Sequence, residues 1–450
     1  MTALTRELGE FVSELTLAAI PEQALLVAKM GFTDCFGVMI AGAREPVIAL
    51  ADRELGTADG PDLASLFPGL QPRRVEDAAL INGMAAHVLD YDDVTLDGHP
   101  SAVLVPAILA QAEASRASGA EMLTAYVAGY EVWTELLVRE PVPLHQKGWH
   151  PTAVRGPVAA AAACAKLRRL DASTTSTALA IAASMAGGLV ANFGSMTKCF
   201  QVGRAAQSGV IAARLAQAGL TASPDALEHQ SGYLIALSPH GTPDLAKPFR
   251  KDQEWHLVRQ GLNVKRYPIC YATHRAIDGA LALAAGHGLQ PTDVDRVSVS
   301  TGQMQMLMLR NDRPKTALEA KFSLQFAIAA ALVARNVGLA ELTDEFVQSA
   351  AVQSLIPRVS VNTTTETMEG SAFAPSEIVE IATRSGKIFS SEPIRFARGS
   401  KQNPLSREEL LTKFADCLGS SFGEGAKTRT FEKLMGLERL NSAGDLSPLQ

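Results

Sequence analysis

Four short stretches of the sequence combine side chains that can move protons with side chains that can bind anions. The first stretch covers residues 82–106, and its titratable side chains are His87, Asp90, Asp92, Asp93, Asp97 and His99. Carboxylates this close to imidazoles must share hydrogen bonds or shift their pKa values. Clusters of this kind are typical of sites that perform acid/base catalysis.

The other three stretches place basic residues at the predicted starts of apolar helices. They cover residues 148–152, 193–206 and 265–278, and they contribute His150, Lys198, Arg204, Lys265, Cys270, His274 and Arg275. The amino end of a helix favours negative charge, so these positions suit a bound anion. Taken together, the stretches offer cations to bind a carboxylate and imidazoles to transfer protons.

Each of these residues also has a purely structural interpretation. A histidine at a helix end can act as a cap, and Lys198 can extend its alkyl stem toward solvent. The aspartates can form a solvated turn, and Cys270 can be a small buried hydrophobe. The recurrence of such residues at helix starts, in a region that is otherwise sparing of polar side chains, favours a carboxylate pocket.

Helices must position most of these side chains, because the sequence up to about residue 274 is rich in Ala and Leu. We expect helices over residues 102–114, 156–170, 176–190 and 203–220. Their apolar residues cover most faces, which predicts burial within a large all-helical domain. Polar residues interrupt the longest apolar stretches, so we predict no membrane-spanning segment.

The pattern changes after residue 288, where short alternating segments appear. Residues 295–300, 357–362 and 377–383 alternate apolar and polar side chains as half-buried strands do, and a turn at 384–387 predicts a hairpin. Residues 322–333 and 339–349 predict helices between the strands. The expected fold is therefore mostly α. A large all-helical domain (1–274, completed by 401–450) is joined to a smaller α+β lid domain (275–400).

The overall composition limits the classes of partner. The 450 residues include 41 basic and 47 acidic side chains, giving a net charge of -6 without a basic stripe, so we expect no nucleic-acid partner. The five cysteines are far apart and form no CxxC pair, which argues against a zinc site or a disulfide framework. The amino-terminal residues lack an apolar signal segment, and we expect a cytoplasmic protein with a small carboxylate substrate.

Six segments of the chain resemble, in the same order, conserved blocks of the MmgE/PrpD family. They read NGMAAHVLDYDD, GHPSAVLVPA, GWHPTAVRG, FGSMTKCFQVGRAAQSGV, YPICYATHRAID and EAKFSLQFA, within about residues 10–420. This family includes 2-methylcitrate dehydratase, cis-aconitate decarboxylase and an iminodisuccinate epimerase. The resemblance implies a helical domain with an α+β lid, a homodimer, and no metal or organic cofactor.

The resemblance also implies which side chains form the pocket. The matching positions are Asp90, His99, His150, Lys198, Lys265 and His274. Cys270 stands where the decarboxylase branch is expected to have histidine. Phe326 stands where many members have tyrosine, and Gln201 replaces a histidine common after the Thr-Lys pair. These differences remove a phenol and at least one imidazole, which weighs most against decarboxylation.

The chemistry shared by these reactions assigns a role to each residue. Removing a proton next to a carboxylate leaves an enediolate-like dianion, which requires a base and nearby cations. We expect His99 and His150 to be the base and the acid, Lys198 to hold the carboxylate and transfer protons, and Asp90 to orient His99 or a lysine. The candidate substrate-binding residues are Lys265, His274, Cys270, Arg204 and Asp93.

Several reactions are consistent with such a site. The resemblance favours a dehydratase, whereas the missing phenol and imidazole favour an epimerase of an iminodisuccinate-like dicarboxylate. We rank three further alternatives below these two. They are a cis-aconitate-type decarboxylase, a non-enzymatic helical binding protein, and a metallohydrolase with Asp90, Asp92, Asp93 and His99 as ligands.

Overall fold

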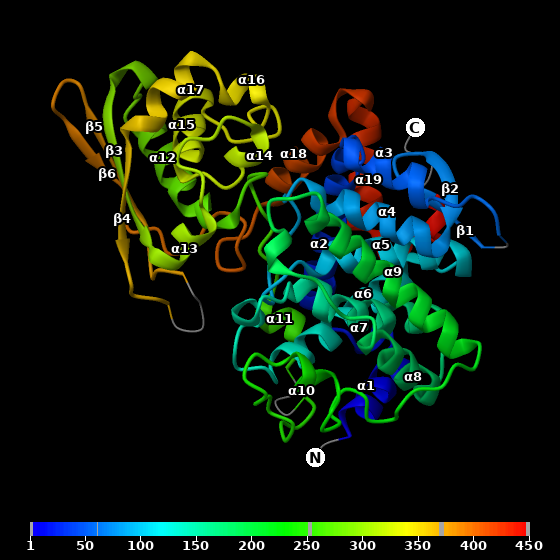
Figure 1. The fold of residues 1–450 in the computed structure, drawn as a ribbon. Helices are drawn as coiled ribbons and strands as arrows, with labels where there is room; N and C mark the ends of the chain where they lie inside the picture. The colour runs from blue at the N-terminus through cyan, green and yellow to red at the C-terminus, as the bar shows by residue number, and fades with distance from the viewer. Residues whose placement is uncertain (1–2, 61, 251–253, 369–372, 447–450) are drawn as a thin grey trace. The chain divides into compact units, whose positions relative to one another are not determined.

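The computed structural model describes residues 3–60, 62–250, 254–368 and 373–446, which form two compact units (Figure 1). The first unit is Met1–Asn263 together with Arg407–Gln450, and the second is Val264–Ser406. The division falls before residue 264, earlier than the predicted boundary after 274. Tyr267, Ile269 and Cys270 already pack in the hydrophobic core of the second unit, so the segment before residue 275 belongs there.

The first unit is built mainly from helices that pack against one another. Its described helices are α1 (Leu4–Glu14), α2 (Glu22–Gly42), α3 (Pro46–Leu55), α4 (Val75–Val88), α5 (Pro100–Ser115), α6 (Gly119–Leu137), α7 (Pro151–Leu167), α8 (Ala172–Ala183), α9 (Thr197–Gln217), α10 (Tyr233–Leu237), α11 (His256–Gln260), α18 (Arg407–Leu418) and α19 (Glu424–Met435). All residues from Val158 to Ala165 in α7 are fully buried. Such short side chains let neighbouring helix backbones approach closely, as expected from the Ala-rich sequence.

The description of this region as all-helical was wrong in one respect. Strands β1 (Leu63–Leu66) and β2 (Leu70–Arg74) form an antiparallel hairpin between α3 and α4. These strands are short and β2 contains Pro72, so they lack the alternating pattern that indicates a strand. Helix α8 also ends at Ala183 rather than near 190. The segment after it bonds to the start of α7, where the Gly188 carbonyl accepts from the His150 amide.

From the sequence we expected no segment that could span a membrane. Helix α2 does not meet that expectation. Among the described residues, it is long and apolar enough to do so by length and composition. However, 72% of its apolar window is buried inside the protein. Phe32 and Phe36 are both fully buried, as they would be in a core helix.

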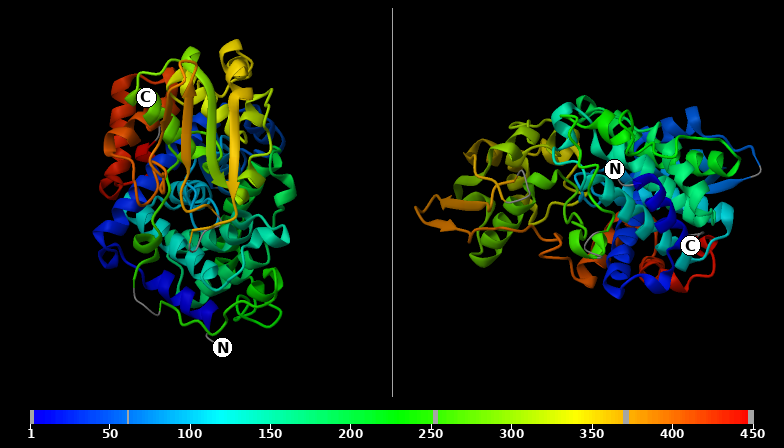
Figure 2. Two further views of the ribbon diagram at one scale, coloured as in Figure 1. Left: turned by 90° about the vertical axis from the view of Figure 1, so that its left-hand side faces the viewer. Right: turned by 90° about the horizontal axis from the view of Figure 1, so that it is seen from below.

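The second unit combines a mixed sheet with helices, and this confirms the predicted fold class of a large helical part with a smaller α+β part. The helices are α12 (His274–Gly286), α13 (Gln303–Met308), α14 (Ala317–Ala320), α15 (Leu324–Ala334), α16 (Asp344–Val347) and α17 (Ala350–Leu355). The strands are β3 (Val294–Gly302), β4 (Val359–Thr364), β5 (Ile378–Thr383) and β6 (Ile388–Ser390), in the order β4-β3-β5-β6. Only the β3–β4 pair is parallel. Helices α12 and α15 cover one face of this sheet (Figures 1 and 2).

The predicted strands and the hairpin after residue 383 are present, but the single helix predicted over 339–349 is not. The Thr343 side chain accepts a hydrogen bond from the Phe346 amide, and this cap starts α16 only at Asp344. The short α17 then begins after Ser349. Two short helices therefore replace one.

Candidate active site

Three of the predicted catalytic side chains lie at the amino ends of three helices. His99 is the N-cap residue of α5 and His150 is the N-cap residue of α7, and a proline follows each of them. Lys198 is the second residue of α9. Proline suits the first helical position because its fixed φ matches the helix and its missing N–H is not needed there. Free backbone N–H groups at such ends favour a bound anion.

The loop between α4 and α5 carries the acidic residues of the site in a constrained backbone. Asp90, Leu96 and Asp97 have φ angles of 54°, 53° and 59°. Residues other than glycine seldom adopt this left-handed conformation, and strained backbone of this kind concentrates at functional sites. Two hydrogen bonds hold the middle of the loop, because Val94 donates to the Asn263 carbonyl and accepts from Asn263 Nδ2.

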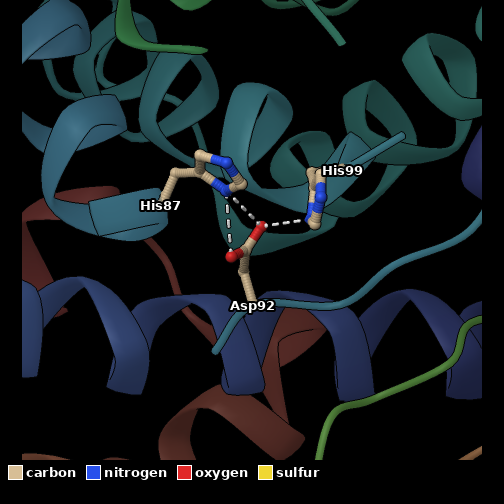
Figure 3. Close-up of side chains that lie close together, drawn as sticks. All are labelled: His87, Asp92 and His99. Atoms are coloured by element: carbon tan, nitrogen blue, oxygen red, sulfur yellow. Dashed lines mark hydrogen bonds and ion pairs between the residues drawn. The ribbon is translucent and has the colours of Figure 1, made fainter. Parts of the chain in front are cut away.

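Asp92 lies between two imidazoles (Figure 3). Both Asp92 oxygens are 3.1 Å from His87 Nδ1, and Oδ2 is 2.9 Å from His99 Nδ1. His99 Nδ1 is also 3.0 Å from the Asp93 carbonyl oxygen. Since both neighbours of His99 Nδ1 are acceptors, this nitrogen donates, and Nε2 is the nitrogen left for chemistry.

Burial and the contacts between these side chains determine the charge states of Asp92 and His87. Burial alone would raise the pKa of Asp92, but the charges and hydrogen bonds of His87 and His99 outweigh it and hold that pKa well below its usual range. Burial lowers the pKa of His87 to about 4, against the opposing effect of Asp92. His87 Nε2 has no hydrogen-bond partner within the described part of the chain. At neutral pH, His87 is therefore a neutral donor and Asp92 a buried anion.

His150 has a fixed tautomer because of Gln201. The Gln201 Nε2 group donates to the Leu189 carbonyl over 3.2 Å, which leaves Oε1 to face His150 Nδ1 at 2.7 Å. An amide oxygen can only accept, so His150 Nδ1 carries the proton and Nε2 has a free lone pair. Burial, followed by the charges of His87 and Lys198, lowers the pKa of His150 well below its usual value. His150 is thus a neutral base at physiological pH.

Lys198 brings a positive charge to the same place. Its Nζ lies 2.8 Å from Asp90 Oδ1, and the two side chains are only 14% and 10% exposed. The ammonium also lies 5.3 Å from the centre of the Phe193 ring, which in turn packs edge-on against His150 at 4.9 Å. A lysine in the first turn of a helix opposes the helix dipole, and the Asp90 carboxylate offsets that unfavourable interaction.

These side chains form one cluster. The ring centres of His87 and His99 are 4.4 Å apart, and those of His87 and His150 are 6.4 Å apart. The charge of Lys198 lowers the pKa values of both His87 and His150. His99, His150, Lys198 and Asp90, the four residues that the sequence proposes as catalytic, therefore lie near one another.

Among the described residues, the side chains of two other predicted residues of the first unit form no hydrogen bond with these imidazoles. Arg204 donates to Gln207 Oε1 on its own helix. The Asp93 carboxylate is fully buried, and its charged and polar neighbours include Asp34 and Cys35. The contact of Asp93 with His99 is made by its main-chain carbonyl oxygen.

The remaining predicted residues belong to the second unit. Lys265 is 1% exposed and Cys270 is 8% exposed. His274 begins α12, packs against Tyr267 and Tyr271, and lies 3.2 Å through Nε2 from the Ile269 carbonyl oxygen. The last contact shows that Nε2 carries a proton.

Phe326, the residue in place of a tyrosine, is part of the hydrophobic core of the second unit. Its ring is fully buried and packs edge-on against Phe346 at 6.4 Å. The phenyl group at this position therefore has a packing role in this protein.

His87, Asp92 and Gln201 also belong to this cluster, and the sequence did not single them out as site residues. The sequence shows His87 and Asp92 in the acidic stretch, but no spacing rule pairs two residues across a helix end and a strained loop. Gln201 appeared only as a replaced histidine. Its position one helical turn after Lys198, on the helix whose start carries that cation, was the available signal.

His87, Asp92 and His99 also form a group that could hold a metal ion, since their ligand atoms lie within 4.8 Å of one another. Two imidazoles and a carboxylate suit divalent transition metals. The group shares only Asp92 and His99 with the ligand set considered from the sequence, because Asp90 pairs with Lys198. In the arrangement described here, both Nδ1 atoms are hydrogen-bonded to Asp92, so a metal would have to replace those bonds.

Comparison with known proteins identifies the fold that carries this site. A family model described as the MmgE/PrpD N-terminal domain matches residues 6–246, and one described as the MmgE/PrpD C-terminal domain matches residues 267–436. Cis-aconitate decarboxylase of Homo sapiens is 27% identical over 431 aligned residues, which cover 92% of this chain and 87% of that protein. The cis-aconitate decarboxylase of Mus musculus is 29% identical over 352 residues (75% and 70%), and that of Aspergillus terreus is 24% identical over 478 (100% and 95%). The relatives thus carry the name of a reaction that we ranked low from the sequence. With both domain models matched in order across a helical unit and an α+β unit, the chain belongs to the MmgE/PrpD family.

Proposed function

We propose that this protein is an acid/base lyase that moves a proton on the carbon next to a carboxylate of a small di- or tricarboxylate. One observation carries the proposal. A neutral imidazole with a free Nε2, that of His150, lies in one cluster with the Lys198 ammonium at the amino ends of two helices. A base and a cation arranged in this way can remove a proton and stabilise the negative charge that results.

Each side chain of the cluster has a role in this mechanism. His150 Nε2 takes the proton from carbon, while Lys198 and the helix amino ends stabilise the enediolate-like charge on the carboxylate. Asp90 holds Lys198 in place. His99 Nε2 then transfers a proton to the leaving group, and Asp92 compensates the positive charge that forms on His99 when it holds a second proton.

Within this class we propose elimination of water from a β-hydroxy acid as the reaction. The His99–Asp92 pair supports this choice, because a departing hydroxyl needs a nearby acid. A second candidate is decarboxylation of cis-aconitate, which the names of the relatives favour. Cys270 and Phe326 stand where that branch is expected to carry a histidine and where many members carry a tyrosine. At 24–29% identity, these differences leave the two reactions for experiment to separate.

The test is to incubate the protein in D₂O with citrate, 2-methylcitrate, cis-aconitate and a small set of dicarboxylates, and to follow each by NMR. Appearance of an alkene from a hydroxy acid supports dehydration. Loss of a carboxyl carbon as CO₂ supports decarboxylation, and deuterium exchange without net conversion indicates an epimerase. A parallel series with EDTA tests whether His87, Asp92 and His99 act through a metal.

The matched variant is Lys198→Met, which keeps an unbranched side chain only one atom shorter and removes its charge. We expect it to lower the rate about 10²-fold or more. If the wild-type protein neither converts nor exchanges any of these acids, and none of them raises its melting temperature, the proposal is wrong. From the family resemblance we also propose a homodimer, which light scattering would measure.

A further inference from the structure

Helix α18, the first helix after the second unit, places a charged side chain inside the first unit. It packs against α2, where Gly37 permits the approach: a Cβ atom at Gly37 would lie 2.8 Å from Phe414 Cδ2. Phe414 is 1% exposed. The close contact carries the preceding residue, Lys413, into the interior, where it is 6% exposed.

Lys413 has several partners there, drawn from two distant parts of the chain. Its Nζ lies 2.6 Å from Asp34 Oδ1 on α2 and donates to the Tyr91 carbonyl oxygen over 2.9 Å. It also lies 4.0 Å from the centre of the Tyr91 ring. A buried ammonium is stable only when it is paired and hydrogen-bonded, and the carboxylate, the carbonyl and the aromatic face meet that requirement.

Tyr91 is the residue between the two carboxylates that organise the site. Asp90 holds Lys198, and Asp92 accepts from His99 and His87. The φ angle of Asp90 is 54°, so the backbone here is in a conformation that the chain adopts only when its surroundings impose it. The hydrogen bond to the Tyr91 carbonyl is such an imposed contact, because it fixes the peptide plane that joins Tyr91, the neighbour of Asp90, to Asp92.

We propose that Lys413 is a positioning residue for catalysis: its ammonium holds the Tyr91 carbonyl and thereby directs Asp90 toward Lys198 and Asp92 toward His99. The helix after the second unit thus sets the geometry of the site in the first. This inference rests on the proposed function for its kinetic consequences. Its structural consequences, the positions of the His87 and His99 rings, can be measured without any substrate.

The experiment compares Lys413→Met with a matched control in the same C-terminal segment. Lys427 of α19 is 8% exposed and pairs with Glu424 at 2.7 Å, so Lys427→Met also removes a buried ammonium. Histidine NMR at fixed pH reports the imidazole signals of the folded proteins. Steady-state kinetics on the acid found to be converted reports kcat and KM.

We expect Lys413→Met to lower kcat about 10- to 100-fold with KM little changed, since small misplacement of catalytic groups has effects of that size. The imidazole signals of His87 and His99 should move in this variant. Lys427→Met should lose stability but keep kcat and those signals. Lys413→Gln, which is neutral but can still donate to the carbonyl, should be less impaired than Lys413→Met.

The proposal is overturned if folded Lys413→Met has the kcat and imidazole signals of the wild-type protein, or if Lys427→Met loses kcat equally. If Lys413→Met does not fold, Lys413→Leu, which is also neutral and cannot donate a hydrogen bond, decides in the same way: unchanged kcat and signals overturn the proposal. If the wild-type protein converts none of the acids, the proposed function fails, and the imidazole signals alone still test Lys413.

Discussion

At the scale of single residues, the acceptor beside each imidazole determines what that imidazole can do. His99 donates to a carboxylate, His150 to a neutral amide, and His87 shares the carboxylate of His99. A carboxylate partner supports a positive charge on the ring, whereas an amide partner leaves the ring neutral. In the mechanism that we propose, the same side-chain type therefore serves as an acid at one position and a base at another.

Asp93 gives the site a measurable dependence of stability on pH. Burial, reinforced by the negative charges of Asp92 and Asp34, raises its pKa to about 8 from an ordinary 3.8. Between these values the folded chain binds more protons than the unfolded chain, so stability falls as pH rises toward 8. The lowered pKa of His87 acts in the opposite direction, but only between about 4 and 6.5.

We therefore expect the free energy of unfolding to fall between pH 6.5 and 8, by up to about 1.4 kcal/mol per pH unit from Asp93 alone. Asp93→Asn should flatten this dependence, because the amide does not titrate. Urea denaturation at several pH values measures it. Parallel slopes for the two proteins across this range would show that Asp93 is already ionised in the folded state.

Part of this site could be predicted from the sequence, because the chemical type of each side chain can be read there. His99, His150, Lys198 and Asp90 are rare titratable groups at helix starts, and residue type alone marks them. His87 and Gln201 were not singled out because their place in the cluster depends on distances of about 3 Å to Asp92 and His150. The substrate-binding roles of Asp93 and Arg204 stay predictions, since sequence proximity does not say which way a side chain faces.

At the scale of elements, close helix packing sets the distance between the groups that carry charge. Helix α4 ends beside His87 and α9 begins beside Lys198, and the two helices touch through Gly83 and Gly203. A Cβ atom at Gly203 would lie 2.2 Å from the Leu80 carbonyl oxygen. Only glycine allows this approach without a shift of one helix.

We expect Gly203→Ala to destabilise the protein by about 1–3 kcal/mol, the usual effect of overpacking, and to reduce activity by separating α9 from α4. Gly286→Ala is the control, because no atom lies within 4 Å of the added Cβ and alanine favours a helix. Chemical denaturation of both variants gives the comparison. Equal stabilities would mean that the helices adjust freely and that the contact does not fix the site.

The elements themselves were predictable where a strong pattern exists. Ala-rich α5, α7 and α9 and the alternating β3 follow from residue preference and periodicity. The β1–β2 hairpin and the break between α16 and α17 depend on short segments, where a single proline or a capping threonine decides the outcome. In segments this short, the pattern of apolar and polar residues is the weakest guide to secondary structure.

At the scale of the whole molecule, the net charge of -6 would repel an anionic substrate. For the carboxylate substrate that we propose, attraction must therefore come from local groups, and our proposal assigns this role to Lys198 and the amino ends of α5, α7 and α9. The chain also returns to the first unit as α18, whose Lys413 contacts the loop of the site. Neither feature can be read from composition, because both depend on which distant segments meet.

The role of His150 as the base can be measured by the exchange of a substrate C–H proton with D₂O, followed by NMR for the wild-type protein and for His150→Asn. We expect exchange to fall about 10²- to 10⁴-fold in folded His150→Asn, because the base is gone. His240→Asn, a change at an exposed histidine, should exchange at the wild-type rate. Exchange at the wild-type rate in folded His150→Asn would contradict the assignment of His150 as the base and with it the proposed mechanism.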